Sequence, residues 1–307
     1  MTASLRIGVD VGGTNLRAGV ASGTQVLWEH RHAADFSHIC RNNPAPQALE
    51  RIIAELAAAI SHARQQYPDA ASVGIGFPGF IDPATGIVSL SPNLPGLSNI
   101  DIARPLARQL GMPVRIENDA LAAAYGEYLR ALPQPESLIY LGLGTGVGGG
   151  MILDGKPWPG QHGVSMEVGH IIVQPGGRHC GCGNRGCLEQ YASASGVAIS
   201  FRELSKVSRD SESIAALAAQ GDAHAVEAFR FASEMLAVAL AHILKVVDVE
   251  TVVIGGGMGA AWPLLQPRFD EYLDAVLIPA LRGRIRVMLA QAGDQAGMLG
   301  AAMLSAA

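Results

Sequence analysis

Residues 167–189 read EVGHIIVQPGGRHCGCGNRGCLE, a run that sets a histidine-containing segment and three cysteines between two glutamates. Cys180, Cys182 and Cys187 form the pattern C-x-C-x4-C. Thiolates spaced so closely on a loop can converge on one tetrahedral zinc ion, with an imidazole as the fourth ligand. The stretch therefore predicts a structural zinc loop, and we work outward from it.

Two histidines are candidates for the fourth ligand. His170 is the expected donor, and His179 is the rival. Glycines between the cysteines permit the tight backbone bends of a zinc knuckle, which favours zinc over three unligated thiols. A disulfide is the weaker alternative, because three clustered cysteines leave one unpaired and Cys40 lies far away in the sequence.

The run E-x-G-H followed by C-x-C-G-x-x-G-C-L-E resembles the signature of the ROK family of sugar kinases and related repressors, and within that family it looks most like the bacterial glucokinases. The resemblance implies an α/β, two-lobed actin-like ATPase (ribonuclease H-like) fold with a cleft between the lobes. It also implies a zinc that shapes the sugar pocket and takes no part in phosphoryl transfer. The implied zinc ligands are His170, Cys180, Cys182 and Cys187, and the implied contacts to hydroxyls at the sugar's reducing end are Glu167, His170 and Glu189.

Composition indicates a compact globular protein. The chain has 307 residues, of which 49% are hydrophobic and 16% are charged, so it can bury a large core and most naturally forms two lobes. The formal net charge is −5. The basic footprint of a nucleic-acid-binding protein is absent, so we expect no nucleic acid partner.

The beginning of the chain lacks the charged start, apolar run and small-residue cleavage site of a signal peptide, because a strand-like sequence begins by Leu5. Glycine or charge interrupts the apolar runs before membrane-spanning length. We therefore expect a cytoplasmic protein without a membrane partner.

The first candidate phosphate site follows a buried strand, LRIGVDV at residues 5–11, and precedes a second strand-like run. A glycine pair between two strands lets backbone amides approach an anion, and Asp10 can face a metal carried by that anion. A purely structural hairpin is the alternative. The segment is neither a Walker A loop, because G-K-[ST] is missing, nor a Rossmann fingerprint, because no helix follows.

This D-x-G-G-T-N hairpin resembles the first phosphate loop of the actin-like ATPase and sugar kinase superfamily. The resemblance places Asp10 near Mg²⁺ and makes Gly12, Gly13 and Thr14 flank the phosphates of ATP. Asn15 stands where many relatives carry lysine, so a charged contact is not expected there.

Two further glycine turns point to the nucleotide. Gly144, Thr145 and Gly146 lie between two strand-like runs and repeat the plan of the first hairpin, which suggests two lobes of similar core, each with a phosphate loop. A structural hairpin is again the alternative. Family resemblance places the third turn, Gly255-Gly256-Gly257, against the adenosine.

Two loops are candidates for sugar contact. Pro78 and Gly79 end a short strand, and the family places this turn beside the sugar, mainly through backbone. Asn93 lies in a turn-rich loop and offers both a donor and an acceptor, as a sugar hydroxyl requires. Loop asparagines are usually turn formers, and only the resemblance of N-L-P-G to glucokinases favours the binding role.

Asn118 and Asp119 come at a strand end and lead into an alanine-rich helix. Asp119 taken alone reads as an N-terminal helix cap. A kinase acting on hydroxyl groups, however, needs a carboxylate that takes the proton from the attacking oxygen. The resemblance assigns this catalytic role to Asp119 and a sugar hydrogen bond to Asn118. Met166 occupies a place where family members commonly have glycine, so we expect this chain's substrate choice to depart there.

The expected small lobe spans residues 1–117 and is completed by a C-terminal helix at 294–307, and the large lobe spans 118–293 with the zinc loop. Relatives in the family are commonly dimers or tetramers, which implies a homodimer or homotetramer. The expected reaction is ATP-dependent phosphorylation of a hexose at its 6-hydroxyl, with glucose first.

Three alternatives remain. An N-acetylhexosamine kinase, for N-acetylglucosamine or N-acetylmannosamine, shares every motif, as does a fructose or allose kinase. A sugar-responsive repressor would need an additional amino-terminal helix-turn-helix domain, whereas here the phosphate hairpin begins within about ten residues of Met1. We therefore expect an enzyme.

Overall fold

The computed structural model describes residues 4–13 and 15–305. The chain divides into two compact units, which are described separately below. The first unit comprises Met1–Glu136, Gly150–Ser165 and Gln291–Ala307, and the second comprises Ser137–Gly149 and Met166–Ala290. The lobe boundaries expected from the sequence, at 117/118 and 293/294, stay a prediction.

The first unit is built on a five-stranded sheet with the order β3-β2-β1-β4-β8. The strands are β1 (Leu5–Val11), β2 (Asn15–Ser22), β3 (Gln25–Ala33), β4 (Ser72–Phe77) and β8 (Val114–Asn118). β1, β4 and β8 run parallel, with Asp10 paired to Gly76 and Gly76 paired to Glu117. Their carboxyl ends therefore meet at one edge of the sheet, where ligands of open α/β sheets bind.

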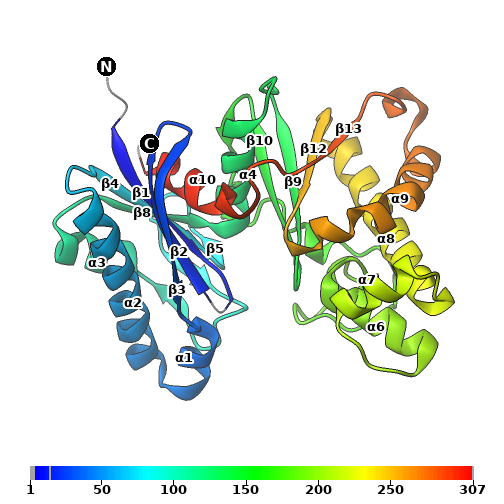
Figure 1. The fold of residues 1–307 in the computed structure, drawn as a ribbon, viewed down its shortest axis with the longest axis horizontal. Helices are drawn as coiled ribbons and strands as arrows, with labels where there is room; N and C mark the ends of the chain where they lie inside the picture. The colour runs from blue at the N-terminus through cyan, green and yellow to red at the C-terminus, as the bar shows by residue number, and fades with distance from the viewer. Residues whose placement is uncertain (1–3, 14, 306–307) are drawn as a thin grey trace. The chain divides into compact units, whose positions relative to one another are not determined.

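The two faces of β1 meet different helices, because successive side chains point to opposite faces of a sheet. Ile7 and Val9 are fully buried in the core that includes residues of α2 (Ala45–Gln66). Gly8 faces α10 (Ala296–Leu304), where an added Cβ would lie 2.0 Å from the Met298 carbonyl oxygen. Only glycine lets α10 pack this closely, and α10 contacts β1, β2 and β4 (Figure 1).

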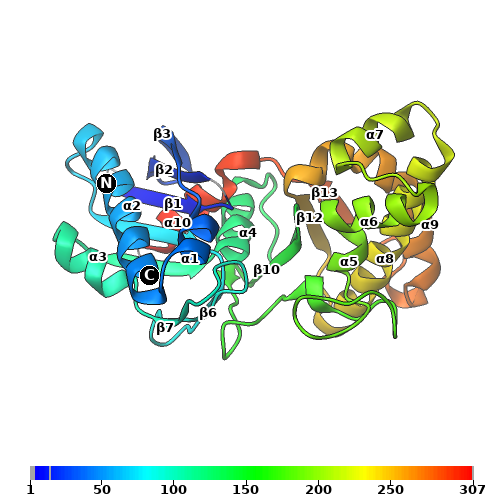
Figure 2. The same ribbon diagram turned by 90° about the horizontal axis from the view of Figure 1, so that it is seen from below.

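The remaining elements of the first unit are helices and short strands, of which β11 (Lys156–Pro157) belongs to the second sheet described below. Helix α4 packs on α10, and α3 packs on α2 (Figure 2). Helix α3 also contacts β8, as does the short strand β5 of a small three-stranded sheet. These remaining elements of the first unit are α1 (Phe36–Asn42), β5 (Phe80–Ile81), β6 (Val88–Leu90), β7 (Ser98–Ile100), α3 (Ala103–Leu110), α4 (Asp119–Arg130), β11 (Lys156–Pro157) and the 3-10 turn η4 (Gly293–Gln295).

The second sheet has the order β11-β10-β9-β12-β13. Its further strands are β9 (Leu138–Leu143), β10 (Val147–Leu153), β12 (Thr251–Gly255) and β13 (Arg286–Leu289). β9, β12 and β13 run parallel, so the turns that follow β9 and β12 lie at the same edge. β10 turns back directly after the glycine turn that ends β9, as β2 does after β1.

Helices make up most of the rest of the second unit. The 25-residue α8 contacts four others, α5, α6, α7 and α9, because apolar residues occupy much of its circumference. The elements are η1 (Val168–His170), α5 (Glu189–Ala192), α6 (Ala194–Ser205), α7 (Ser211–Ala219), α8 (Ala223–Val247), η2 (Gly257–Ala261), α9 (Trp262–Val276) and η3 (Pro279–Leu281).

The structure adds strands that the sequence pattern does not predict, and β3 is the longest of them. β3 reads QVLWEHRHA, and the burial of its side chains is intermediate or low throughout. It lies at the edge of the sheet, where only one side is hydrogen-bonded. An edge strand needs no apolar run, because both of its faces can carry polar groups.

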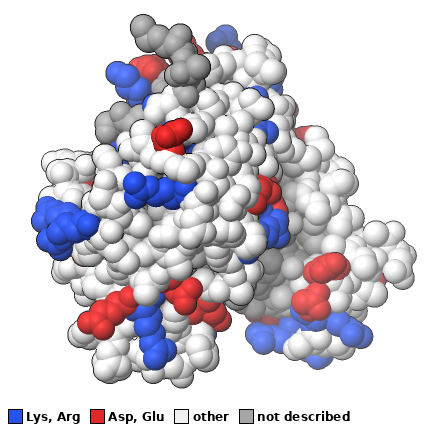
Figure 3. Space-filling view, turned by 60° about the vertical axis from the view of Figure 1, so that its left-hand side comes forward, with Lys and Arg blue, Asp and Glu red and all other residues white. Residues whose placement is uncertain are grey.

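Within the described residues, no helix combines the length and apolar character needed to cross a bilayer. On the face drawn in Figure 3, acidic and basic side chains lie in small mixed groups separated by uncharged surface. This mixture agrees with a charged fraction of only 16%.

Candidate active site and metal centre

Asp10 lies at the carboxyl end of β1, at the edge where the parallel strands of the first unit end. Burial, followed by the nearby Asp119 carboxylate, raises the pKa of its carboxyl group to about 7, although Arg17 opposes the shift. Two acidic groups so close together in a partly buried position favour a bound cation or a shared proton. Asp10 therefore fits the role of a carboxylate beside a hard metal ion.

Asp119 is the first residue of α4, and the helix cap is Asn118 instead. The Asn118 side-chain oxygen accepts a hydrogen bond from the Leu121 amide at 3.0 Å. Asp119 Oδ1 accepts from the Ala120 amide at 2.9 Å. Burial raises the pKa of Asp119, although that hydrogen bond opposes the shift. Because the capping role belongs to its neighbour, Asp119 is not needed as a cap.

One hydrogen bond joins Asn118 to the Gly79 turn, and another joins that turn to the loop that carries Asn93. Asn118 Nδ2 donates to the Gly79 carbonyl at 3.0 Å, and Ser91 Oγ donates to the Pro78 carbonyl at 2.5 Å. Gly79 has a φ of 146°, which side-chain-bearing residues rarely adopt. Asn93 lies exposed in the loop that Ser91 anchors.

The first glycine hairpin closes on itself. The Gly12 amide donates to the Asn15 carbonyl at 2.9 Å, so this amide is already used within the hairpin. Gly13 is exposed, and a Cβ there would meet open space. Thr14 lies outside the described residues.

Two residues near Asp10 were not identified from the sequence. Gly297 in α10 abuts Asp10, because an added Cβ would lie 2.6 Å from the Asp10 Cγ atom. Asp294 accepts hydrogen bonds from Arg17 at 2.8 Å and from Arg31, and the bond from Arg17 holds the Asp294 pKa below its usual range. The small residues of the last helix could have indicated the Gly297 contact from the sequence, since small residues permit close packing.

The second glycine turn repeats the closure of the first. The Gly144 amide donates to the Gly146 carbonyl at 2.9 Å, which leaves Thr145 exposed at the tip. Glu189 Oε2 accepts from the Val147 amide at 3.2 Å. An added Cβ on Gly146 would lie 2.3 Å from that same carboxylate oxygen. The glycine turn and the Glu189 side chain therefore pack directly against each other.

The third glycine turn packs against the end of β9. β9 and β12 are neighbouring parallel strands, with Gly142 paired to Gly255. Gly256 has a φ of 82°, and a Cβ there would lie 2.3 Å from the Leu143 carbonyl oxygen. Gly257 begins the 3-10 turn η2. The second unit thus brings the two glycine turns to one sheet edge.

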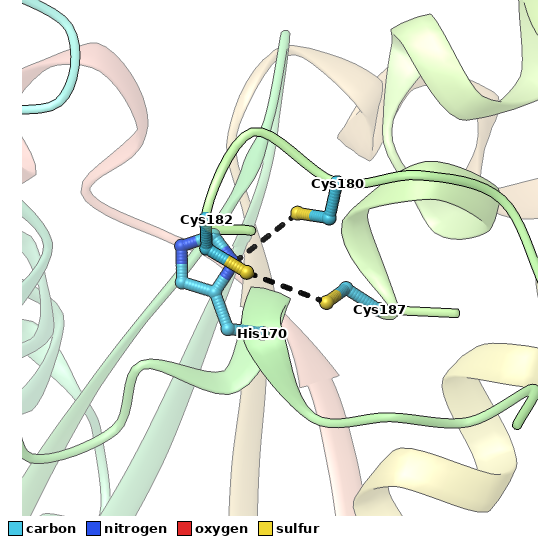
Figure 4. A group of neighbouring side chains, drawn as sticks. All are labelled: His170, Cys180, Cys182 and Cys187. Carbon is cyan, nitrogen blue, oxygen red and sulfur yellow. Dashed lines mark hydrogen bonds between the residues drawn. The ribbon is translucent and has the colours of Figure 1, made fainter. Parts of the chain in front are cut away.

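The zinc loop brings four candidate ligands together (Figure 4). His170 Nδ1 lies 3.6 Å from Cys180 Sγ, and Cys182 Sγ lies 3.7 Å from Cys187 Sγ. The four ligand atoms all lie within 4.8 Å of one another. His179 forms a β-bridge with Arg185 and stays outside this group, so the first of the two candidate histidines is the one that joins the cysteines.

These distances fit a tetrahedral zinc ion. With Zn–S of about 2.3 Å and Zn–N of about 2.05 Å, tetrahedral geometry separates two sulfurs by about 3.8 Å and a sulfur from a nitrogen by about 3.6 Å. Burial, followed by the neighbouring thiols, raises the pKa of Cys187 to about 12. A metal ion would displace that proton and balance the clustered thiolates. The residues present therefore fit the metal that the motif predicts.

The other imidazole nitrogen of His170 faces away from the cysteines. His170 Nε2 lies 3.9 Å from Glu167 Oε2, and both side chains are partly exposed. The Nδ1 atom of His170 thus lies with the cysteine sulfurs, while its Nε2 atom lies near the Glu167 carboxylate. Met166 has a φ of 62°, so a residue with a Cβ adopts the backbone conformation that favours glycine.

The structure thus gathers the expected site residues into two sets, one in each unit. The first set is Asp10, Gly12, Gly13, Asn15, Gly79, Asn93, Asn118 and Asp119, all in the first unit. The second set is Gly144, Thr145, Gly146, Glu167, His170, Cys180, Cys182, Cys187, Glu189, Gly255, Gly256 and Gly257, all in the second.

Comparisons with known proteins agree with these features. The family model described as "ROK family" matches residues 6–307. The chain is 33% identical to a glucokinase of Thermotoga maritima, in a match that covers 97% of this chain and 96% of that protein. It is also 33% identical to an N-acetyl-D-glucosamine kinase of Escherichia coli, in a match that covers 97% of this chain and 98% of that protein. Among solved structures, a ROK family glucokinase from Streptomyces griseus in complex with glucose and AMPPNP is 31% identical with a TM-score of 0.82, covering 98% of this chain and 99% of the other. The fold is the mixed α/β, two-sheet fold of the actin-like sugar kinases, and the chain belongs to the ROK family.

Proposed function

We propose that this chain is a sugar kinase that transfers the terminal phosphoryl group of ATP to the 6-hydroxyl of a hexose, with glucose as the preferred substrate. The carrying observation is Asp119, a partly buried carboxylate at the carboxyl end of β8 whose pKa is raised by burial. A raised pKa makes a carboxylate a stronger proton acceptor. Two comparisons support glucose and ATP as the substrates. The chain is similar to a glucokinase, and a related glucokinase has been solved in complex with glucose and AMPPNP.

The proposed reaction is an in-line displacement. Asp119 accepts the proton of the sugar hydroxyl while that oxygen forms a bond to the γ phosphorus, and the bond between this phosphorus and the oxygen bridging to the β phosphate breaks, so that ADP leaves. Asn118 positions Asp119 and the Gly79 turn, because its side chain is bonded to both neighbouring segments. Catalysis of phosphoryl transfer depends mainly on positioning of the reacting groups and on electrostatic stabilisation, and Asn118 contributes to the positioning.

Other residues bind the reactants in this proposal. Glu167, His170 and Glu189 hold hydroxyls at the reducing end of the sugar, supported by the outward-facing His170 nitrogen beside Glu167. The three glycine turns receive the nucleotide. A magnesium ion bound with ATP would neutralise charge on the phosphates, and Asp10 is the residue that would lie beside it. Zinc at His170 and the three cysteines would brace the sugar-binding loop.

A second candidate function is phosphorylation of N-acetylglucosamine. The N-acetyl-D-glucosamine kinase of Escherichia coli is as similar in sequence as the glucokinase. The two substrates differ at the second carbon of the sugar. Met166, with its left-handed backbone, immediately precedes the Glu167 that we assign to the reducing end, so this position is where the two functions would diverge.

One experiment separates these functions. ADP release is measured with ATP and a panel containing glucose, N-acetylglucosamine, N-acetylmannosamine, fructose and allose. We expect the largest kcat/KM with glucose. A larger value with N-acetylglucosamine would support the second function, and failure to release ADP with every sugar would refute the kinase proposal.

The assignment of the base is tested by Asp119→Asn, which keeps the size of the side chain. We expect kcat to fall by at least ~100-fold, the lower end for loss of a general base. Asp69→Asn, at an exposed position after α2, is the matched control and should keep normal turnover. A kcat near normal in Asp119→Asn would contradict the role of this residue.

A further inference from the structure

Three histidines of the first unit, none of them used in the proposed reaction, face one another. His30 and His32 lie two positions apart on β3 and point to the same face of the sheet, toward α2, which carries His62. Ring centroids of His30 lie 4.6 Å from His32 and 4.8 Å from His62, and those of His32 and His62 lie 5.6 Å apart. Trp28 borders the group, with its ring 5.1 Å from His62.

One imidazole nitrogen in this group lacks a partner. His32 Nε2 is buried and, among the described residues, has no hydrogen-bond partner. A buried polar atom without a partner destabilises the folded state, and such an atom in a folded protein calls for an explanation, such as a bound ion. The opposite face of the strand carries the charged partners, since Arg31 bonds to Asp294.

We propose that His30, His32 and His62 form a second transition-metal site, with zinc as its occupant. Three ligand nitrogens of these residues lie within 4.8 Å of one another. Nitrogens at about 2.05 Å from a tetrahedral zinc are about 3.3 Å apart, so small rotations of the exposed and partly exposed rings close the site.

The chemistry of the ligands favours a borderline metal. Neutral imidazoles suit zinc, copper and nickel, whereas magnesium and calcium require oxygen ligands. Three histidines leave the fourth position of a tetrahedral ion open to water or a small anion.

A metal in this position would tie the edge strand to a helix. β3 pairs only with β2, and α2 lies in the core of the same unit. Leu16 is the register partner of His32 and lies next to Asn15, where the phosphate hairpin ends. Metal binding would therefore stabilise the β2–β3 pair beside that hairpin, because a ligand that binds only the folded state adds to its stability.

Cobalt titration of the protein with zinc already bound at the cysteine loop tests this site. We expect one equivalent of Co²⁺ to produce visible ligand-field absorption without a thiolate-to-cobalt charge-transfer band in the near ultraviolet. His62→Ala and His30→Ala should each abolish the absorption, and His30 is exposed, so its replacement should leave folding intact. His242→Ala, at an exposed position of α8, is the control and should retain it.

Thermal unfolding gives a second measurement. Added zinc should raise the Tm of the wild-type protein and of His242→Ala by a few degrees, about 2–4 °C per 1 kcal/mol of binding stabilisation. The same addition should leave the Tm of His30→Ala unchanged. The site is refuted if cobalt gives only the charge-transfer band of the cysteine loop, or if absorption persists in both cluster variants.

Discussion

Replacing Glu127 with glutamine should destabilise the first unit markedly. Glu127 lies in α4 with only 3% of its surface exposed. Its carboxylate accepts hydrogen bonds from the amides of Gln291 at 2.7 Å, Ala292 at 3.1 Å and Gly293 at 3.1 Å. These amides begin the turn that leads into α10, the helix that packs on β1.

The size of the effect follows from the number of donors. Glutamine has one acceptor oxygen instead of two, so at least one of the three amides loses its bond and faces an NH₂ group. Loss of a hydrogen bond to a charged group costs about 1.5–3 kcal/mol, and a buried unsatisfied donor costs about 1–3 kcal/mol. These costs overlap, so we expect a loss of about 3–4 kcal/mol, equivalent to a fall in Tm of about 6–16 °C at about 2–4 °C per kcal/mol.

Urea unfolding and calorimetry measure this loss directly. Glu55→Gln makes the same chemical change at an exposed position of α2, and its free energy of unfolding should change by less than about 0.5 kcal/mol. Equal unfolding midpoints for the two variants would show that the Glu127 carboxylate does not hold the start of α10.

Three further predictions concern the sites. Gly146→Ala should displace the Glu189 side chain, because the new Cβ would lie 2.3 Å from its carboxylate oxygen. The KM for the sugar should then rise about tenfold, because one hydrogen bond between the sugar and a charged group is lost. Gly259→Ala, where a Cβ meets open space, is the control, and an unchanged KM for Gly146→Ala would contradict the contact. Between about pH 4 and pH 7 the folded chain holds a proton on Asp10 that the unfolded chain has lost, because burial raises the Asp10 pKa to about 7; stability should therefore fall as pH rises through this window, by no more than about 4 kcal/mol from this group. Asp10→Asn should weaken that decline in urea unfolding without added magnesium, and an unchanged slope would count against the shift. Cys182→Ser, made in a His30→Ala background so that the proposed histidine site is removed, should release zinc, measured by elemental analysis, and lower both Tm and sugar affinity. One tightly retained zinc per chain in that double variant would exclude the proposed cysteine-loop ligands.

Local sequence determined the elements whose cause is local. The apolar run of β1, the alanine-rich sequence of α4 and the glycine turns after β1 and β9 are all short-range patterns, and the structure has each of these elements. The zinc loop is also local, because its three cysteines are separated by few residues and glycines allow the chain to bend between them. Kinship with the ROK family could therefore be identified from the motifs alone.

Tertiary structure decided what depends on contacts between distant segments. Asn118 rather than Asp119 caps α4, which the order of residues could not settle, and Gly297 reaches Asp10 only because α10 packs on β1. Glu127 contacts the amides of residues 291–293, and His62 contacts His30 and His32. These partners are too far apart in the sequence for a helical or strand-like periodicity to predict the contacts. Local patterns reflect the geometry of single elements, whereas the partner of a buried charge or imidazole is set by the packing of elements far apart in the chain.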